Sequence, residues 1–126
     1  MPRISIYFFT IAVLCALAGM VWGSVMGATQ DHLLYPAHAH LNLLGWVTLS
    51  IMGGFYAISP TPPGRLAWAN LVLSAGGAII MAPMLAYLLS GHDVQMGPLM
   101  PIAEAPVILG MLCFLISVLR AGRKAA

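Results

Sequence analysis

The sequence predicts an all-α integral membrane protein: a four-helix up-and-down bundle with both termini on the cytoplasmic side. Of the 126 residues, 61% are hydrophobic and only 6% are charged, and the mean hydropathy is +0.96. Charged residues make up about a quarter of an ordinary soluble domain. Apolar runs of about twenty residues can cross a bilayer as helices, whereas transmembrane β-strands would alternate in polarity over about ten residues. We therefore expect one transmembrane domain over residues 1–126.

The first predicted span covers residues 4–27. A signal peptide is the alternative, because residues 16–18 (Ala-Leu-Ala) form an acceptable cleavage site. The apolar run continues well past that site, which favours a retained transmembrane helix. Gly19, Gly23 and Gly27 recur at intervals of four, and so form a strip where another helix or a flat cofactor can approach closely. Helix packing is the expected use of this strip.

Three further spans follow, separated by segments rich in proline, glycine and polar residues. Pro36 suits the first turn of a helix, where its missing N–H has no helical partner in any case. Residues 59–65 contain three prolines and predict a tight hairpin, because proline cannot continue a helix. The remaining spans are predicted over residues 37–58, 66–90 and 99–120.

The basic residues orient the predicted bundle, because Lys and Arg of short loops stay in the cytoplasm. All five fall on one membrane side: Arg3, Arg65, Arg120, Arg123 and Lys124. They are too few and too scattered for a nucleic-acid surface, so nucleic acid is excluded as a partner. A bacterial cytoplasmic membrane is the expected location. Aromatic residues at this end fit an interfacial belt: Tyr7, Tyr56 and Trp68.

The main functional candidate is the segment 35–46, which places two histidines and an asparagine at the outer start of the second span. Polar and metal-binding side chains are costly within a membrane and usually mark functional sites. At about 100° per residue, His38 and His40 point to nearly opposite sides of the helix. His38 shares its side with Asn42 and Gly45, and a glycine beneath an imidazole leaves room for a planar ligand. The other side carries His40, Leu44, Val47, Ile51 and Gly54.

Imidazole is the commonest metal ligand in proteins, and a ligating ring usually donates its second N–H to an acceptor. Asn42 or a carboxylate is the expected acceptor. Glu104 supplies a carboxylate at the same membrane surface, and we expect it to be protonated, hydrogen-bonded or paired with a histidine of the second span. The structural alternative is a proline-bent helix whose Glu104 makes only a local hydrogen bond. His32 and His92 lie in outer loops, where they are solvated residues or additional metal ligands.

Methionine offers a second chemistry at the outer half of the bundle. Thioether and imidazole ligands together suit copper, especially Cu(I). Methionine also fills irregular apolar gaps without any metal. The outer methionines are Met20, Met26, Met81, Met84, Met96 and Met100.

The string His40-Leu-Asn-Leu-Leu-Gly-Trp46, preceded by His38 and followed by residues 53–56 (Gly-Gly-Phe-Tyr), resembles the second-helix motif of the haem-copper oxidase superfamily. Its nearest branches are the nitric oxide reductases and the cbb3-type oxidases. The string is also similar to short membrane proteins described as subunit-I-like and to the NnrS family, which contains haem and copper. The resemblance covers one span with its flanks. It implies that His40 is an axial ligand of haem b near the outer, periplasmic surface.

Catalytic subunits of that superfamily carry further histidines on later helices. Residues 66–90 and 99–120 contain none, so one copy of this chain cannot build an oxygen-reducing or NO-reducing binuclear centre. We expect a membrane haem b protein for electron transfer or for binding small gases such as NO or O2, without turnover of its own. The second axial ligand would come from His38, His92, a methionine or another subunit.

Two alternatives belong to other functional classes. The first is a copper-handling membrane protein that uses the outer methionines together with His32, His38, His40 and His92. The second is a non-catalytic structural or assembly subunit, whose histidines and Glu104 form hydrogen bonds between helices. The expected partners are the lipid bilayer, further copies of the chain in a dimer or trimer, and a redox protein or quinol.

Overall fold

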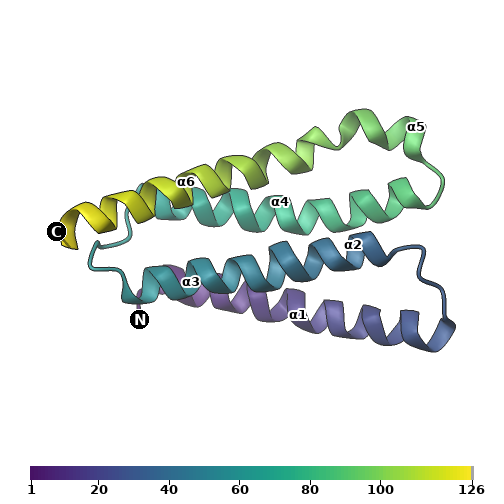
Figure 1. The fold of residues 1–126 in the computed structure, drawn as a ribbon, viewed down its shortest axis with the longest axis horizontal. Helices are drawn as coiled ribbons and strands as arrows, with labels where there is room; N and C mark the ends of the chain where they lie inside the picture. Colours follow the sequence, from purple (N-terminus) through teal and green to yellow (C-terminus); the bar gives the residue numbers. More distant parts are fainter. Residues whose placement is uncertain (126) are drawn as a thin grey trace.

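The computed structural model describes residues 1–125, and every regular element within that range is helical. Four helical spans are long and apolar enough to cross a membrane, as expected for a membrane protein. They are Arg3–Thr29, Tyr35–Ile58, Arg65–Leu89 and Asp93–Arg123. Successive spans run back and forth, so the two termini lie at the same end of the molecule (Figure 1). The prediction of an all-helical chain with four spans is confirmed.

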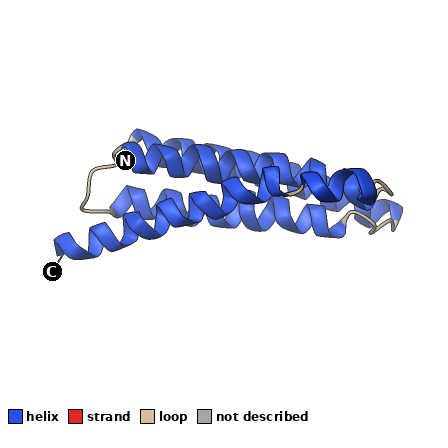
Figure 2. Cartoon of the chain, turned by 90° about the horizontal axis from the view of Figure 1, so that it is seen from above, coloured by secondary structure: helices blue, strands red, loops and turns tan. Residues whose placement is uncertain are grey.

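The spans contain eight helical elements in chain order. The first span is the single helix α1 (Arg3–Thr29), and the third is α4 (Arg65–Leu89). The second joins α2 (Tyr35–His40), the π-helical segment η1 (Leu41–Thr48) and α3 (Leu49–Ile58) without a break. The fourth joins the short α5 (Asp93–Met96), the 3-10 turn η2 (Gly97–Leu99) and α6 (Pro101–Ala125). Figure 2 shows how completely helix dominates the described chain.

The span boundaries follow the expected breaking residues, with one clear difference. Pro36 lies in the first turn of α2, and α1 ends at Thr29, followed by Gln30 with a left-handed φ of 56°. The difference is the predicted loop 91–98, most of which forms α5 and η2. Pro98 lies at the start of η2, where a missing N–H removes no helical hydrogen bond, so it does not interrupt these turns.

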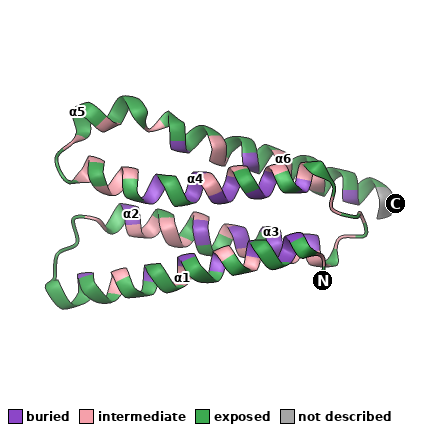
Figure 3. Cartoon of the chain, turned by 180° about the vertical axis from the view of Figure 1, so that it is seen from behind, coloured by how far each residue is buried: buried purple, intermediate pink, exposed green. Residues whose placement is uncertain are grey.

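The helices pack as two antiparallel pairs joined through α4. The helix α1 packs mainly on η1 and α3, and α6 packs mainly on α4. Contacts of α4 with α2, η1 and α1 hold the pairs together. Figure 3 shows that buried positions lie where helices face each other, while α5 and the neighbouring part of α6 are largely exposed. Exposed apolar side chains cover the outer faces, as a surrounding lipid phase requires.

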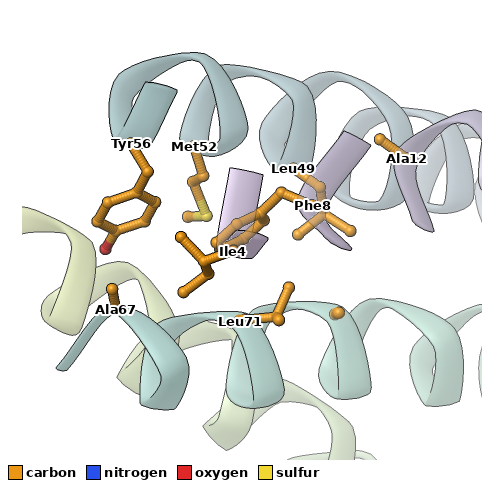
Figure 4. Close-up of a cluster of buried hydrophobic side chains, with 9 residues drawn as sticks. Ile4, Phe8, Ala12, Leu49, Met52, Tyr56, Ala67 and Leu71 are labelled. Atoms are coloured by element: carbon orange, nitrogen blue, oxygen red, sulfur yellow. The ribbon is translucent and has the colours of Figure 1, made fainter. Parts of the chain in front are cut away.

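A cluster of buried apolar side chains (Figure 4) lies in the parts of α1, α3 and α4 nearest the end that contains the termini. Phe8 is fully buried, and its ring stacks on Tyr56 with centroids 5.6 Å apart. The small alanine side chains of α4 let α1 and α3 pack closely against α4. The cluster comprises Ile4, Phe8 and Ala12 of α1, Leu49, Met52 and Tyr56 of α3, and Ala67, Leu71 and Ala75 of α4.

A chain of side-chain hydrogen bonds crosses this core and links three helices. Ser74 donates to Asn70 Oδ1 (2.8 Å), and Asn70 Nδ2 donates to the Tyr56 hydroxyl (3.1 Å). Tyr56 then donates to Ser117 Oγ (3.0 Å), which donates to the Cys113 carbonyl (2.9 Å). In this network each hydroxyl donates one hydrogen bond, and the hydroxyls of Tyr56 and Ser117 also accept one. The polar side chains of the network therefore find their hydrogen-bond partners inside the core. Tyr56 is buried, so its predicted place in an interfacial belt is wrong.

Replacing Tyr56 by phenylalanine is expected to lower the free energy of unfolding by about 1–2 kcal/mol, because Asn70 Nδ2 then loses its acceptor inside the core. Asn70 is completely buried and has no access to solvent. Thermal unfolding in a mild detergent measures the change. Tyr7→Phe is the matched control, since Tyr7 is exposed and its hydroxyl makes no hydrogen bond with the described residues. Equal stability of Tyr56→Phe and the wild type would contradict the role assigned to this network.

Candidate functional site

His40 is the last residue of α2, and its side chain is exposed in the half of the second span that lies farther from the two termini. Its Nδ1 lies 2.8 Å from the carbonyl oxygen of Pro36, one helical turn earlier. A carbonyl oxygen only accepts hydrogen bonds, so this contact places the proton on Nδ1. The lone pair of Nε2 is therefore left free to bind a metal, as in many proteins where a backbone carbonyl orients a ligating imidazole.

The surface around His40 is apolar and open. Further along the span, Val47 and Ile51 are exposed, and Leu44 is half-buried. A methyl group added at Gly54 would meet no atom within 4 Å. The geometry provides one imidazole nitrogen above an apolar surface.

His38 lies on the opposite side of the span and packs against α1. A Cβ added at Gly23 would lie 3.1 Å from His38 Cε1, and the Trp22 ring meets the imidazole edge-on at 6.1 Å. The amide nitrogen of Asn42 donates to the His38 carbonyl (3.0 Å) and lies 3.2 Å from His38 Nε2. The predicted divergence of His38 and His40 is thus confirmed, and the two do not share one site within a protomer.

Asn42 also packs against the glycine strip of α1. A Cβ added at Gly19 would collide with the Asn42 side-chain amide, whereas one added at Gly27 would meet nothing within 4 Å. Two of the three glycines therefore admit side chains of the second span, as expected for helix packing. A shallow groove beside this contact is lined by Gly19, Met20, Gly23, Ser24, His38 and Asn42. Asn42 therefore contacts His38 and the glycines of α1. The hydrogen-bond acceptor of His40 is not Asn42 but the Pro36 carbonyl.

The segment directly after His40 is a π-helix, η1. Thr48 Oγ1 donates to the Leu43 carbonyl five residues earlier (2.8 Å), consistent with the wider turn. Such segments are rare and often occur at functional sites. Within η1, Gly45 is buried, and a Cβ there would lie 2.8 Å from both Cβ and Sγ of Cys15. The expectation that Gly45 leaves room for a planar ligand is wrong in this structure, because Cys15 of α1 occupies that space.

Glu104 lies in the first turn of α6 and is exposed. The helix α6 packs mainly on α4, so Glu104 is not beside the histidines of α2 within one protomer. Among the described residues its carboxylate makes no side-chain hydrogen bond or ion pair. The expected pairing of Glu104 with a second-span histidine is therefore absent from the single chain. A protonated or externally paired Glu104 stays a prediction.

His92 lies between the end of α4 and the start of α5. Its ring stacks on Tyr87 at a centroid distance of 3.8 Å, and its Nδ1 lies 3.2 Å from the Tyr87 carbonyl. His32 is exposed in the connection between α1 and α2. Within residues 1–125, no group of three or more His, Cys, Asp and Glu side chains is arranged to hold a metal ion. The proposed set of His32, His38, His40 and His92 thus does not form one centre in a single chain.

Comparisons with protein-family models, with curated proteins and with solved structures found no match for this chain. The resemblance to the haem-copper oxidase superfamily rests on the motif alone. That motif occupies the end of α2, most of η1 and the second half of α3. His40, the residue that the resemblance implies as haem ligand, is the second-span histidine whose Nε2 has no hydrogen-bond partner within residues 1–125, whereas His38 Nε2 lies beside Asn42.

Proposed function

We propose that this chain is an integral membrane protein that binds haem b through His40 and works in electron transfer. The observation that carries the proposal is the contact between His40 Nδ1 and the Pro36 carbonyl, which leaves Nε2 free on an exposed apolar surface. A polar nitrogen at this depth is costly unless it has a partner. An iron ion within an apolar macrocycle satisfies both the nitrogen and its apolar surroundings.

The residues present fit one axial position of a haem. His40 would supply the ligand, and the Pro36 carbonyl would fix the ring orientation and increase the basicity of Nε2. Exposed apolar side chains of the second span, such as Leu43 and Val47, would provide apolar contacts. When bound, haem b would supply a one-electron couple if six-coordinate, or an open position for NO or O2 if five-coordinate.

The second axial ligand comes from another copy of the chain in this proposal. His38 is engaged with Asn42 and α1, so it cannot reach the His40 side of its own protomer. His40 of a second copy, or His38 of a chain packed differently in the oligomer, would complete the coordination. A homodimer with one haem at its interface satisfies this requirement. Glu104, exposed on the same half, is available to the second copy, to a redox protein or to a quinol.

The membrane orientation follows from charge. Arg3, Arg65 and Arg120 lie near the end that contains both termini, and the positive-inside rule assigns that end to the cytoplasm. His38 and His40 then lie near the periplasmic surface of a bacterial cytoplasmic membrane. The four spans would form an up-and-down bundle that receives or delivers electrons on this side.

The direct test is to purify the protein in mild detergent from haem-sufficient cells and to measure optical spectra with iron and copper content. A reduced b-type spectrum with one iron per two chains would support the haem-bridged dimer. A five-coordinate spectrum that shifts on NO binding would move the function to gas binding. A colourless protein containing copper, or one free of both metals, would reject the haem assignment in favour of copper handling or a structural role.

A further inference from the structure

A cavity lies beneath the loop that joins α3 to α4, at the end of the molecule opposite to His38 and His40. Its volume is about 230 Å³, several times the about 30 Å³ that a water molecule occupies in the liquid. Arg65 of α4 and Arg120 of α6 both line it, together with Ser59 and Thr61 of the loop. The loop connects two membrane-spanning helices, so the cavity lies at the depth of the bilayer surface.

The side chains around this cavity carry positive charge only. Arg65 and Arg120 come from different helices, line the same cavity and are exposed, and like charges brought close together repel each other. The chain has only three acidic side chains, Asp31, Asp93 and Glu104, and all belong to the other half of the molecule. No side-chain carboxylate of this chain is therefore placed to pair with Arg65 and Arg120. A bound anion would supply the counter-charge.

The uncharged polar groups of the cavity are also donors without acceptors. Thr61 Oγ1 is buried and has no hydrogen-bond partner among residues 1–125. Ser59 Oγ accepts the Thr61 N–H (3.2 Å), so its own hydroxyl proton stays available. The helix α4 begins at Arg65, and its N-cap residue Gly64, which also lines the cavity, provides no side-chain cap. Hydroxyl and arginine side chains that line one cavity are suited to an anion with several oxygen atoms.

We propose that this cavity binds a phosphate group, held by Arg65 and Arg120 with hydrogen bonds from Ser59 and Thr61. Guanidinium groups bind phosphate in bidentate geometry, and the first amides of α4 add to the positive field. The phosphate belongs either to the headgroup of an anionic phospholipid or to a free phosphate ion. The site is independent of the haem proposal, because it lies at the other end of the spans.

The test uses full-length protein purified in uncharged detergent and freed of lipid. It is titrated with dioleoylphosphatidylglycerol, with zwitterionic dioleoylphosphatidylcholine, and with sodium phosphate at constant ionic strength, and the thermal unfolding midpoint is recorded. Binding is expected to raise the midpoint by about 5 °C at saturation. Arg65→Gln and Arg120→Gln should each need about tenfold more of the active ligand for the same shift.

Arg123→Gln is the matched control, because Arg123 is exposed at the same end but does not line the cavity. It should bind as the wild type does. A shift with phosphatidylglycerol alone identifies a lipid headgroup, and one with inorganic phosphate identifies a free anion; either supports the site. The proposal is overturned if no ligand raises the midpoint, or if Arg123→Gln weakens binding as much as the two cavity variants. Both arginines are exposed, so these variants are expected to keep the helical circular dichroism of the wild type.

Discussion

Replacing His40 by alanine is expected to abolish haem binding, so that the purified variant lacks the Soret band and contains no stoichiometric iron. The variant removes the only second-span imidazole whose Nε2 is free and exposed. The variant should unfold at nearly the temperature of the haem-free wild type, because the His40 ring is exposed and makes one local hydrogen bond. Optical spectra and iron analysis of the purified variant measure the first effect, and thermal unfolding measures the second.

Two other histidines provide the controls for this result. His32→Ala removes an exposed loop imidazole and should leave the haem spectrum unchanged. His38→Ala removes the partner of Asn42 on the α1 side and should reduce stability by about 1 kcal/mol. Haem stays bound in this variant if His40 of the second copy is the other axial ligand, and loss of haem would instead assign that position to His38. A His40→Ala protein that keeps a full Soret band would reject His40 as the ligand. A purely structural role would instead make His40→Ala destabilising in a protein that never contained haem.

Alanine is expected to have opposite effects at two glycines of the second span. At Gly45 the added Cβ would lie 2.8 Å from Cβ and Sγ of Cys15, so α1 must move, at a cost of about 2 kcal/mol in the free energy of unfolding. At Gly54 the added Cβ would meet nothing within 4 Å. There the higher helix propensity of alanine should increase stability by up to about 1 kcal/mol. Unfolding of both variants in the same detergent measures the difference.

A double variant identifies the contact responsible. Cys15→Ala removes Sγ but keeps Cβ, so combined with Gly45→Ala it should recover only part of the lost stability. Full recovery would mean that the thiol alone prevents the close approach. If Gly45→Ala and Gly54→Ala have the same effect, the two helices do not approach at Gly45 as closely as the structure places them.

The sequence was sufficient to predict the spans, because bilayer thickness and the cost of burying charge leave few alternatives for so apolar a chain. It also predicted that His38 and His40 diverge, since that follows from helical periodicity alone. The glycines of α1 indicated the strip of that helix where a neighbour can pack, and Gly19 and Gly23 do admit side chains of the second span. These features depend on local chemistry, which a single sequence contains.

The features that were missed depend on contacts between distant residues. Tyr56 resembled an interfacial anchor, and only its spatial proximity to Asn70 and Ser117 shows that it joins a buried network. Asn70, a lone amide within an apolar span, was the available signal. Glu104 was expected near α2 because both lie at the same depth, but depth does not specify which helix is the neighbour. Here α4 is the main neighbour of α6.

The π-helical segment η1 also determines the rotational phase of the second span. Each of its wide turns holds more residues than an α-turn, so η1 sets how far α2 is rotated relative to α3, which is anchored in the core through Leu49 and Met52. Removing one residue from η1 would turn α2 by about 100° about the helix axis. His40 would then leave the exposed surface without any change in its own sequence surroundings. The length of η1, as much as the identity of residue 40, decides which surface presents an imidazole.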